Sequence, residues 1–313
     1  MDGADIIGAR NAASQFPPRE LADLRIAHIV LSMNTGQAQP VPASGLGDRV
    51  LGRLLKQWRG RRGYSQLDLA LAARTTQRHL SFIESGRAAP SRDMVLRLAA
   101  TMDLPLRQQN ALLLAAGYAP AWGERDLSAP GLAVVNRALD YMLAQHEPFP
   151  AFVVDRRWNL LRANRGAARL TEFLTGPAPA EPAAEPVNLA IALMSPDGLR
   201  PLIVNWPEVA LHFLRGVQVD ANTDGTPETL ALLTRLLALP DVPSLSEVLP
   251  PEEGHPPVLP IHFRRGETSL CLFTTIATLG TPRDVTLEEV RIECFFPMDG
   301  ATEAVCRAWS AQN

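Results

Sequence analysis

Hydrophobic positions recur with helical spacing from residue 48 to about residue 118. Val50, Leu54 and Trp58 fall on one face of a helix that is predicted over residues 48–62. Four further amphipathic segments follow, each bounded by Ser, Thr, Gly or Pro, and a helix is expected in each of them: residues 65–74, 75–86, 90–102 and 106–117. The pattern therefore predicts an all-α domain of five helices over residues 48–120.

The pattern changes in the second half of the chain. After a predicted helix over residues 132–146, two apolar runs flank a tight turn at Asp155 to Arg157, which predicts a β-hairpin, and Asn164 is placed to cap a helix that continues to Phe173. Helices are then expected at 187–194, 207–219 and 227–239, and strands at 258–263, 269–279 and 290–296. Because strands and helices are grouped and do not alternate, the fold class is α+β, with an antiparallel sheet whose helices pack on one face.

A chain of 313 residues is long enough for two domains. Residues 1–47 lack sustained periodicity and are expected to be mostly disordered, with a short helix near residues 19–31, and Met33 is an alternative start. Residues 121–131 are interpreted as a linker, and residues 132–313 as the second domain. A Pro- and Ala-rich stretch, residues 175–186, predicts a mobile surface loop.

Charge divides the chain in the same way as periodicity. Residues 48–120 contain 12 Lys and Arg against 5 Asp and Glu, a net charge of +7, whereas residues 121–313 contain 15 against 24, a net charge of −9. This division indicates that a polyanion binds the first domain and is repelled by the second.

Several classes of site and location are disfavoured by the sequence. Cys271, Cys294 and Cys306 show no spacing typical of disulfide frameworks or zinc sites, so no metal is expected. The six histidines are scattered and no nucleophile, phosphate-loop or dinucleotide motif is present, so no catalytic residues, enzyme activity or cofactor are expected. Asp284, Glu288 and Glu289 are interpreted as a helix start. The cysteine pattern leaves a reducing cytoplasm as the expected location. No apolar run reaches the roughly 18 residues of a membrane span, so no membrane partner is expected.

The second and third predicted helices have the features of a helix-turn-helix pair. Ala70 and Ala73 supply small residues where the helices touch, and the front of the second helix is polar. Glutamine can contact adenine with two hydrogen bonds, and arginine can contact guanine or a phosphate. The residues predicted to bind double-stranded DNA are Gln66, Thr76, Gln77, Arg78, Ser81, Ser85 and Arg87, with Ser91 bordering them and His79 beside the reading face.

This segment resembles the Xre/Cro-type family of helix-turn-helix domains. The resembling residues are Ser65-Gln66, Leu69-Ala70, Leu80, Ile83-Glu84, Gly86-Arg87 and Pro90-Ser91. The resemblance implies specific binding to double-stranded DNA, usually as a homodimer. It departs from the family at Arg74, where a small residue or glycine is usual.

The remaining 190 or so residues resemble the ligand-binding domain of MmyB-like bacterial transcription regulators, which begins like a PAS domain. The segments that carry the likeness are 152–164, 199–201, 205–206, 209–210 and 280–297. The resemblance implies a PAS-like sensory domain with an apolar pocket for a small hydrophobic, fatty-acid-like ligand. The pattern offers as lining candidates, most of which would simply be core, Phe152, Val154, Trp158, Leu160, Phe173, Trp206, Phe213, Phe263, Leu270, Leu272 and Ile276. His212 and Arg215, one helical turn apart, could face a ligand carboxylate, and a surface ion pair with a nearby acid is the favoured alternative for either.

Two alternatives remain open at this point. The second domain could serve only for dimerisation, or it could hold a haem or flavin as a redox sensor. No histidine or cysteine has a position typical of an axial ligand. The favoured interpretation is a ligand-responsive transcription regulator that binds a specific DNA operator.

Overall fold

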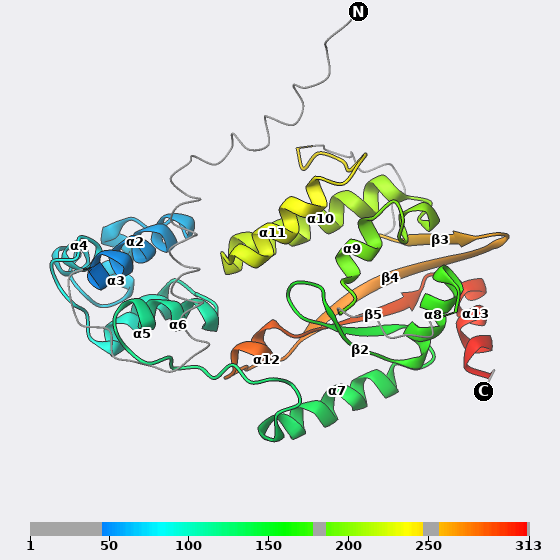
Figure 1. Cartoon of the computed structure of the whole chain (residues 1–313), viewed down its shortest axis with the longest axis horizontal. Helices are drawn as coiled ribbons and strands as arrows, with labels where there is room; N and C mark the ends of the chain where they lie inside the picture. Colours follow the sequence, from blue (N-terminus) through cyan, green and yellow to red (C-terminus); the bar gives the residue numbers. More distant parts are fainter. Residues whose placement is uncertain (1–45, 178–185, 247–256, 312–313) are drawn as a thin grey trace, which may run out of the picture. The chain divides into compact units, whose positions relative to one another are not determined.

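A computed structural model describes residues 46–177, 186–246 and 257–311 (Figure 1). The chain divides into two compact units between Trp122 and Gly123, a boundary that falls inside the expected linker. Most of the segment expected to be disordered, residues 1–47, lies outside the described residues. Most of the predicted loop at 175–186 does as well.

The first unit is helical throughout its described residues. Its helices agree with the predicted segments to within a few residues at each end: α2 (Leu46–Arg61), α3 (Gln66–Ala72), α4 (Gln77–Glu84), α5 (Arg92–Thr101) and α6 (Leu106–Ala115). One apolar core joins them, and it includes Leu55 of α2, Leu80 and Ile83 of α4, and Leu98 of α5, all without exposed surface. The predicted all-α domain is therefore confirmed for these residues.

The turn between α3 and α4 closes the helix-turn-helix pair. Arg74 adopts φ 52°, the left-handed conformation in which glycine is less strained. The Arg74 amide donates to Leu71 O, and the Thr75 amide donates to Ala70 O, so two carbonyls at the end of α3 are satisfied. Gly86, with φ 70°, ends α4 in the same way. Arg74 thus occupies a position suited to glycine without changing the geometry of the turn.

The second unit is built on an antiparallel sheet. Among the described residues its strand order is β2-β1-β5-β4-β3. The strands are β1 (Ala151–Val154), β2 (Leu160–Ala163), β3 (Ile261–Arg265), β4 (Thr268–Thr278) and β5 (Arg291–Pro297). The predicted strand at 258–263 starts later, at Ile261, because Pro260 has no amide hydrogen to donate to the ladder.

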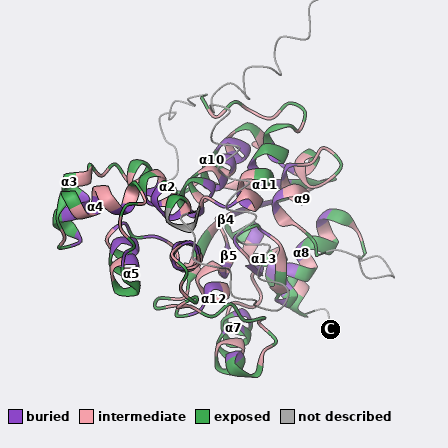
Figure 2. Cartoon of the chain, turned by 60° about the vertical axis from the view of Figure 1, so that its left-hand side comes forward, coloured by how far each residue is buried: buried purple, intermediate pink, exposed green. Residues whose placement is uncertain are grey.

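Helices cover both faces of this sheet, so the expectation that they pack on one face is wrong. On one face, the apolar core contains Phe152 and Phe295 together with α8, α9, α10 and α11. On the other face, Leu139 and Leu143 of α7 pack against Val153 and neighbouring strand residues, while the outer side of α7 is exposed (Figure 2). The bounds of the helices are α7 (Ala133–Gln145), α8 (Arg165–Thr175), α9 (Leu189–Met194), α10 (Trp206–Asp224), α11 (Pro227–Leu237), α12 (Val285–Glu289) and α13 (Gly300–Ala311).

Side-chain caps fix the ends of several helices in this unit. Asn164 lies directly after β2, and its Oδ1 accepts hydrogen bonds from the amides of Ala167 and Ala151, at 2.8 and 2.9 Å. Its predicted role as a cap is therefore confirmed. Asp284 caps α12 by accepting from the Thr286 amide, also as expected. α10 continues five residues beyond the predicted end, because its buried stripe extends through Ala221 and Asp224 to a left-handed glycine, Gly225.

Candidate DNA-binding face and ligand cavity

α4 has polar side chains on its exposed face, and its opposite face is buried in the core. Gln77 and Arg78 are exposed on its first turn, and Ser81 follows one turn later on the same side. Leu80 and Ile83 are fully buried on the opposite side and hold the helix in the core. The guanidinium carbon of Arg78 lies 5.3 Å from the centroid of the Phe82 ring, so this cation is positioned by a neighbouring side chain.

The other residues predicted to bind DNA differ in their surroundings. Arg87 and Ser85 are exposed just after α4, and the Ser85 hydroxyl donates to Phe82 O. Thr76 caps α4, since its Oγ1 accepts from the His79 amide at 3.1 Å. That these residues contact DNA stays a prediction. All of them lie at or next to the ends of α4, whose outer face is exposed.

Gln66 is engaged in a contact that the sequence did not indicate. Its amide nitrogen donates to Glu84 Oε2 at 2.8 Å, and the same carboxylate accepts two hydrogen bonds from Arg59, at 2.6 and 3.1 Å. Arg59 also donates to Tyr64 O. The Glu84 side chain is only 4% exposed, and its hydrogen bond is the main reason that the pKa of Arg59 is raised. These hydrogen bonds join α2, α3 and α4. If Gln66 also contacts a DNA phosphate, as predicted, it does so with a side chain that is already held by Glu84.

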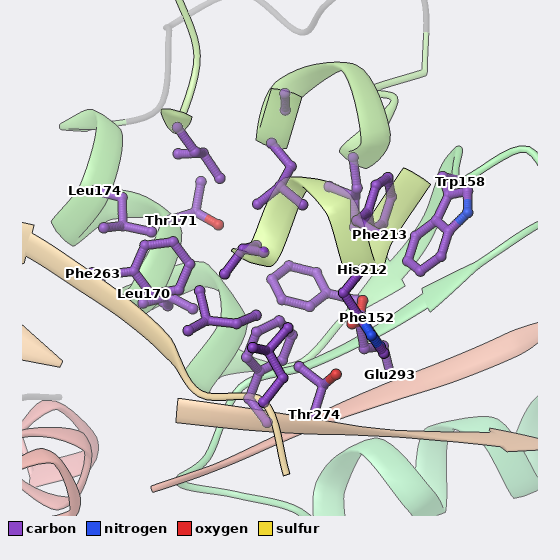
Figure 3. Close-up of a pocket in the computed structure, with 18 of the residues that line it drawn as sticks. Phe152, Trp158, Leu170, Thr171, Leu174, His212, Phe213, Phe263, Thr274 and Glu293 are labelled. Carbon is purple, nitrogen blue, oxygen red and sulfur yellow. The ribbon is translucent and has the colours of Figure 1, made fainter. Parts of the chain in front are cut away.

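The second unit contains a cavity of about 620 Å³ between the sheet and helices α8, α9 and α10. Most of its wall is apolar, and aromatic rings from β1, β3, β5 and α10 contribute to it (Figure 3). Its volume falls within the range of about 300 to 1,000 Å³ that is usual for sites that bind small molecules. The cavity is therefore large enough for a ligand of that class.

Five of the thirteen residues predicted to bind the ligand line this cavity. They are Phe152, Trp158, His212, Phe213 and Phe263. The Trp158 and Phe213 rings contact each other with centroids 4.7 Å apart. His212 is more exposed than these aromatic residues, which places it at the edge of the cavity.

The other eight predicted residues lie outside the cavity wall. Val154 and Leu272 have no exposed surface, because they lie inside the apolar core on this face of the sheet. Leu160 and Trp206 are half-buried at the edge of the same core, and Trp206 is covered by the Arg200 guanidinium at 4.9 Å. Arg215 is exposed on α10. Leu270 belongs to the same core, Phe173 packs against it, and Ile276 is exposed.

Glu293 is the functional candidate that the sequence reasoning missed. It lies on β5, opposite Phe152 of β1 and Ile276 of β4, and its side chain reaches the cavity (Figure 3). Burial raises the pKa of its carboxyl group from 4.5 to about 7, although a hydrogen bond with Thr274 favours ionisation. The sequence did contain a signal for this position. Side chains two residues apart in a strand lie on the same face, so Glu293 shares the face of the apolar Phe295.

The raised pKa of Glu293 predicts a specific pH dependence of stability in the ligand-free protein. Since the folded protein holds this proton up to about pH 7 and the unfolded chain releases it near pH 4.5, stability falls as pH rises through this interval. We expect Glu293→Gln to remove this loss, which amounts to about 3 kcal/mol at most. Denaturation of the second unit between about pH 5 and pH 8 would measure it.

The matched control for this experiment is Glu267→Gln, in the exposed turn between β3 and β4. It removes the same formal charge from the surface, so its stability difference from the wild type should stay nearly constant with pH. A Glu293→Gln variant whose stability changes with pH as the wild type does would contradict the assignment of this carboxyl group.

Neither a membrane span nor a cluster of metal ligands is found among the described residues. None of their helices has both the length and the hydropathy of a bilayer span. Within the same ranges, no three His, Cys, Asp or Glu side chains are grouped as metal ligands.

Comparison with known proteins agrees with both parts of this description. A helix-turn-helix family model matches residues 55–109, which run from the second half of α2 to the first turn of α6. No curated protein sequence matches the chain. Among solved structures, one described as an RNA-binding light-oxygen-voltage receptor aligns with 100% of this chain and 68% of its own, at 16% identity and a TM-score of 0.25, which is too low to support any argument.

The match that covers more than half of the chain is to the MmyB-like transcription regulator ligand binding domain, over residues 135–308. This range contains the whole sheet and every element that lines the cavity. The resemblance seen in the sequence is confirmed, and the chain belongs to the family of MmyB-like transcription regulators.

Proposed function

We propose that the protein binds a specific double-stranded DNA operator as a homodimer, and that a small hydrophobic ligand in the cavity changes its affinity for that operator. The observation that carries the proposal is the combination of an exposed polar face on α4 with an apolar cavity of about 620 Å³ in the other unit. Each feature suits one of the two binding events, and neither requires catalytic chemistry or a cofactor. Because its target is chromosomal DNA, the protein would act in the bacterial cytoplasm.

The DNA-binding part of the proposal rests on the first turn of α4. A recognition helix enters the major groove with its N-terminal residues toward the base edges, and Gln77 and Arg78 occupy those positions. The net charge of +7 over residues 48–120 supports attraction to phosphates. In a dimer, two such helices would contact half-sites about 34 Å apart, one turn of the duplex.

We predict that Gln77→Ala and Arg78→Ala each weaken binding to the selected operator by about 1 to 3 kcal/mol, through lost contacts with bases. Arg97→Ala on the exposed side of α5 removes the same charge outside the helix pair and serves as the control. Gel-shift titrations at one salt concentration would measure all three. Operator affinity equal to that of the wild type in both α4 variants would refute this placement of the reading face.

The link between the units supports the regulatory part of the proposal. Trp122 is held by the first unit, because its amide and indole N–H donate to Asn110 and Gln109. The next residue, Gly123, is held by the second unit, since its carbonyl accepts from the Val285 amide of α12 at 2.8 Å. Trp122 and Gly123 are thus bonded to different units although they are adjacent in the sequence.

α12 itself is joined to the wall of the cavity. It leads directly into β5, which carries Glu293 and Phe295 into the cavity wall. Its Glu289 contacts Arg156 of the hairpin turn at 3.3 Å, and Arg156 contacts Asp224 at the end of α10. A ligand that favours one arrangement of β5 and α10 would thus shift α12 and, with it, Gly123, the residue that follows the DNA-binding unit in the chain.

The ligand is proposed to have a long apolar body, of the size of a fatty-acid chain, since apolar side chains dominate the wall. Native mass spectrometry of the purified protein, followed by lipid extraction, tests for such a molecule. A Leu193→Trp variant, which fills the cavity from α9, should lose the bound species. A species retained equally by both proteins would place the ligand elsewhere.

A further inference from the structure

The outer side of α7 is exposed and yet largely apolar (Figure 2). Val134 and Tyr141 each leave 69% of their surface exposed, the largest fraction of any large hydrophobic residue that the structure describes, and Met142 leaves 39%. Ala138 is exposed between them. Because these four residues recur at i, i+4, i+7 and i+8, they form one stripe along the helix, here called the outer stripe.

The outer stripe is not required for the core of its own unit, because α7 packs on the sheet with its other side, through Leu139 and Leu143. Val219 on α10 provides the contrast. It is 61% exposed, but its exposed neighbours one turn away include the polar Asn222 and Thr223. Single exposed apolar side chains are common on proteins, whereas a continuous apolar stripe indicates a surface that another molecule covers.

Two side chains of opposite charge lie beside the outer stripe, on the same side of it. Arg137 is exposed and makes no ion pair with a described residue. The Asp140 side chain is 66% exposed, although it also pairs with Arg162 at 2.6 Å. Along the helix axis, Arg137 and Asp140 lie about 2 Å to either side of a midpoint next to Ala138. A two-fold axis through this midpoint would therefore bring Arg137 of one copy to the level of Asp140 of the other.

We propose that the outer stripe is the surface through which two copies of this chain associate, with their α7 helices antiparallel and Ala138 next to the two-fold axis. This inference rests on the proposed function, because it takes the protein to be a homodimer. It adds the surface that forms the dimer and the orientation of the two helices.

The stripe and its charges are complementary to a second copy of themselves. In the antiparallel pair, the small Ala138 lets the two helices approach closely, and Tyr141 of each copy packs on Val134 of the other. Arg137 of each copy faces Asp140 of the other, since residues on the same side of two antiparallel helices meet. A parallel pair would place Arg137 beside its own counterpart, where like charges repel.

The first test introduces a charge into the stripe. In sedimentation equilibrium of the full-length protein, Val134→Glu should raise the dimer Kd by at least about tenfold, because a carboxylate would be buried against Tyr141 of the other copy. Arg137→Glu should raise it by about threefold or more, because like charges would then meet. Val219→Glu and Arg235→Glu make the same chemical changes at exposed positions of α10 and α11, and they should dimerise as the wild type does.

The second test probes the orientation of the helices. In Ala138→Cys the two new thiols would lie about 1.5 Å apart along the axis, so oxidation by copper phenanthroline should give a covalent dimer. Ala144→Cys, also exposed on α7, would place them about 16 Å apart along the axis, beyond the reach of a disulfide. It should therefore cross-link no more than the wild type, whose own cysteines are not exposed.

The outcomes separate this inference from the proposed function. If the wild type is a dimer that Val134→Glu leaves unchanged, or if Ala144→Cys cross-links as well as Ala138→Cys, the inference is overturned while the homodimer stands. A wild type that is monomeric up to its solubility limit, yet binds the operator as two chains, also overturns it, because the stripe would then be covered within one chain. If the protein binds its operator as one chain, both the inference and the proposed homodimer fail.

Discussion

Replacement of Gly52 by alanine is expected to destabilise the first unit by about 3 kcal/mol or more. Gly52 lies on α2 where this helix passes α4, and an added Cβ would lie 2.3 Å from Glu84 O and 3.0 Å from Ile83 O. Both atoms belong to the backbone, so no side-chain rotation can relieve the overlap. α2 and α4 would have to separate, which would open the core around Leu55 and Leu80.

Gly60→Ala is the matched control, because it makes the same chemical change in the same helix. Nothing lies within 4 Å of a Cβ added at Gly60, and the residue is exposed. Alanine is the better helix former, so this variant should gain about 0.5 to 1 kcal/mol. Calorimetric unfolding of the first unit measures both changes. Equal stability of the two variants would show that α2 and α4 do not make this close approach.

The second large effect is expected at Glu84. Glu84→Ala leaves Arg59, whose side chain is only 14% exposed, without its carboxylate, and it also removes the hydrogen bond from Gln66. Loss of one partner from a buried pair of this kind costs about 3 to 5 kcal/mol. Denaturant unfolding of the first unit should show this loss, with a parallel loss of operator binding because α4 is no longer fixed.

Glu303→Ala on α13 provides the comparison. Its partner Arg307 lies one turn away at 2.7 Å, and both side chains are largely exposed. A pair of this type contributes about 0.5 kcal/mol or less. If Glu84→Ala proves as mild as Glu303→Ala, the cluster of Arg59, Gln66 and Glu84 does not hold the helices together.

The helix-turn-helix unit follows closely from the sequence because its signals are local. Ser65, Thr76 and Ser91 each cap the helix that follows them, and Gly86 ends α4, as the residue types indicate. The contact of Gln66 with Glu84 was not predictable in this way. It joins residues 18 positions apart and depends on the angle between two helices, which no local pattern reports.

The sequence predicted that the second unit has an apolar cavity, but it did not predict which residues line it. Alternation correctly places Phe152 and Val154 on the same face of β1, yet only Phe152 lines the cavity, because Val154 is enclosed in the apolar core. Which inward residue meets a helix and which meets the cavity depends on the path of α8 to α10 over the sheet. Helices on the second face were also missed, since the apolar side of α7 does not indicate which face of the sheet it covers.

The central claim is that occupancy of the cavity controls affinity for DNA. The most direct measurement is the Kd for the operator of the full-length protein after its lipid has been removed. It is measured with and without the recovered ligand, and the same pair of measurements is made on Leu193→Trp. We predict a change of about tenfold or more in the wild type, equivalent to about 1.4 kcal/mol, and none in the filled variant. An operator Kd that does not respond to the ligand, or that responds equally in both proteins, would contradict the account.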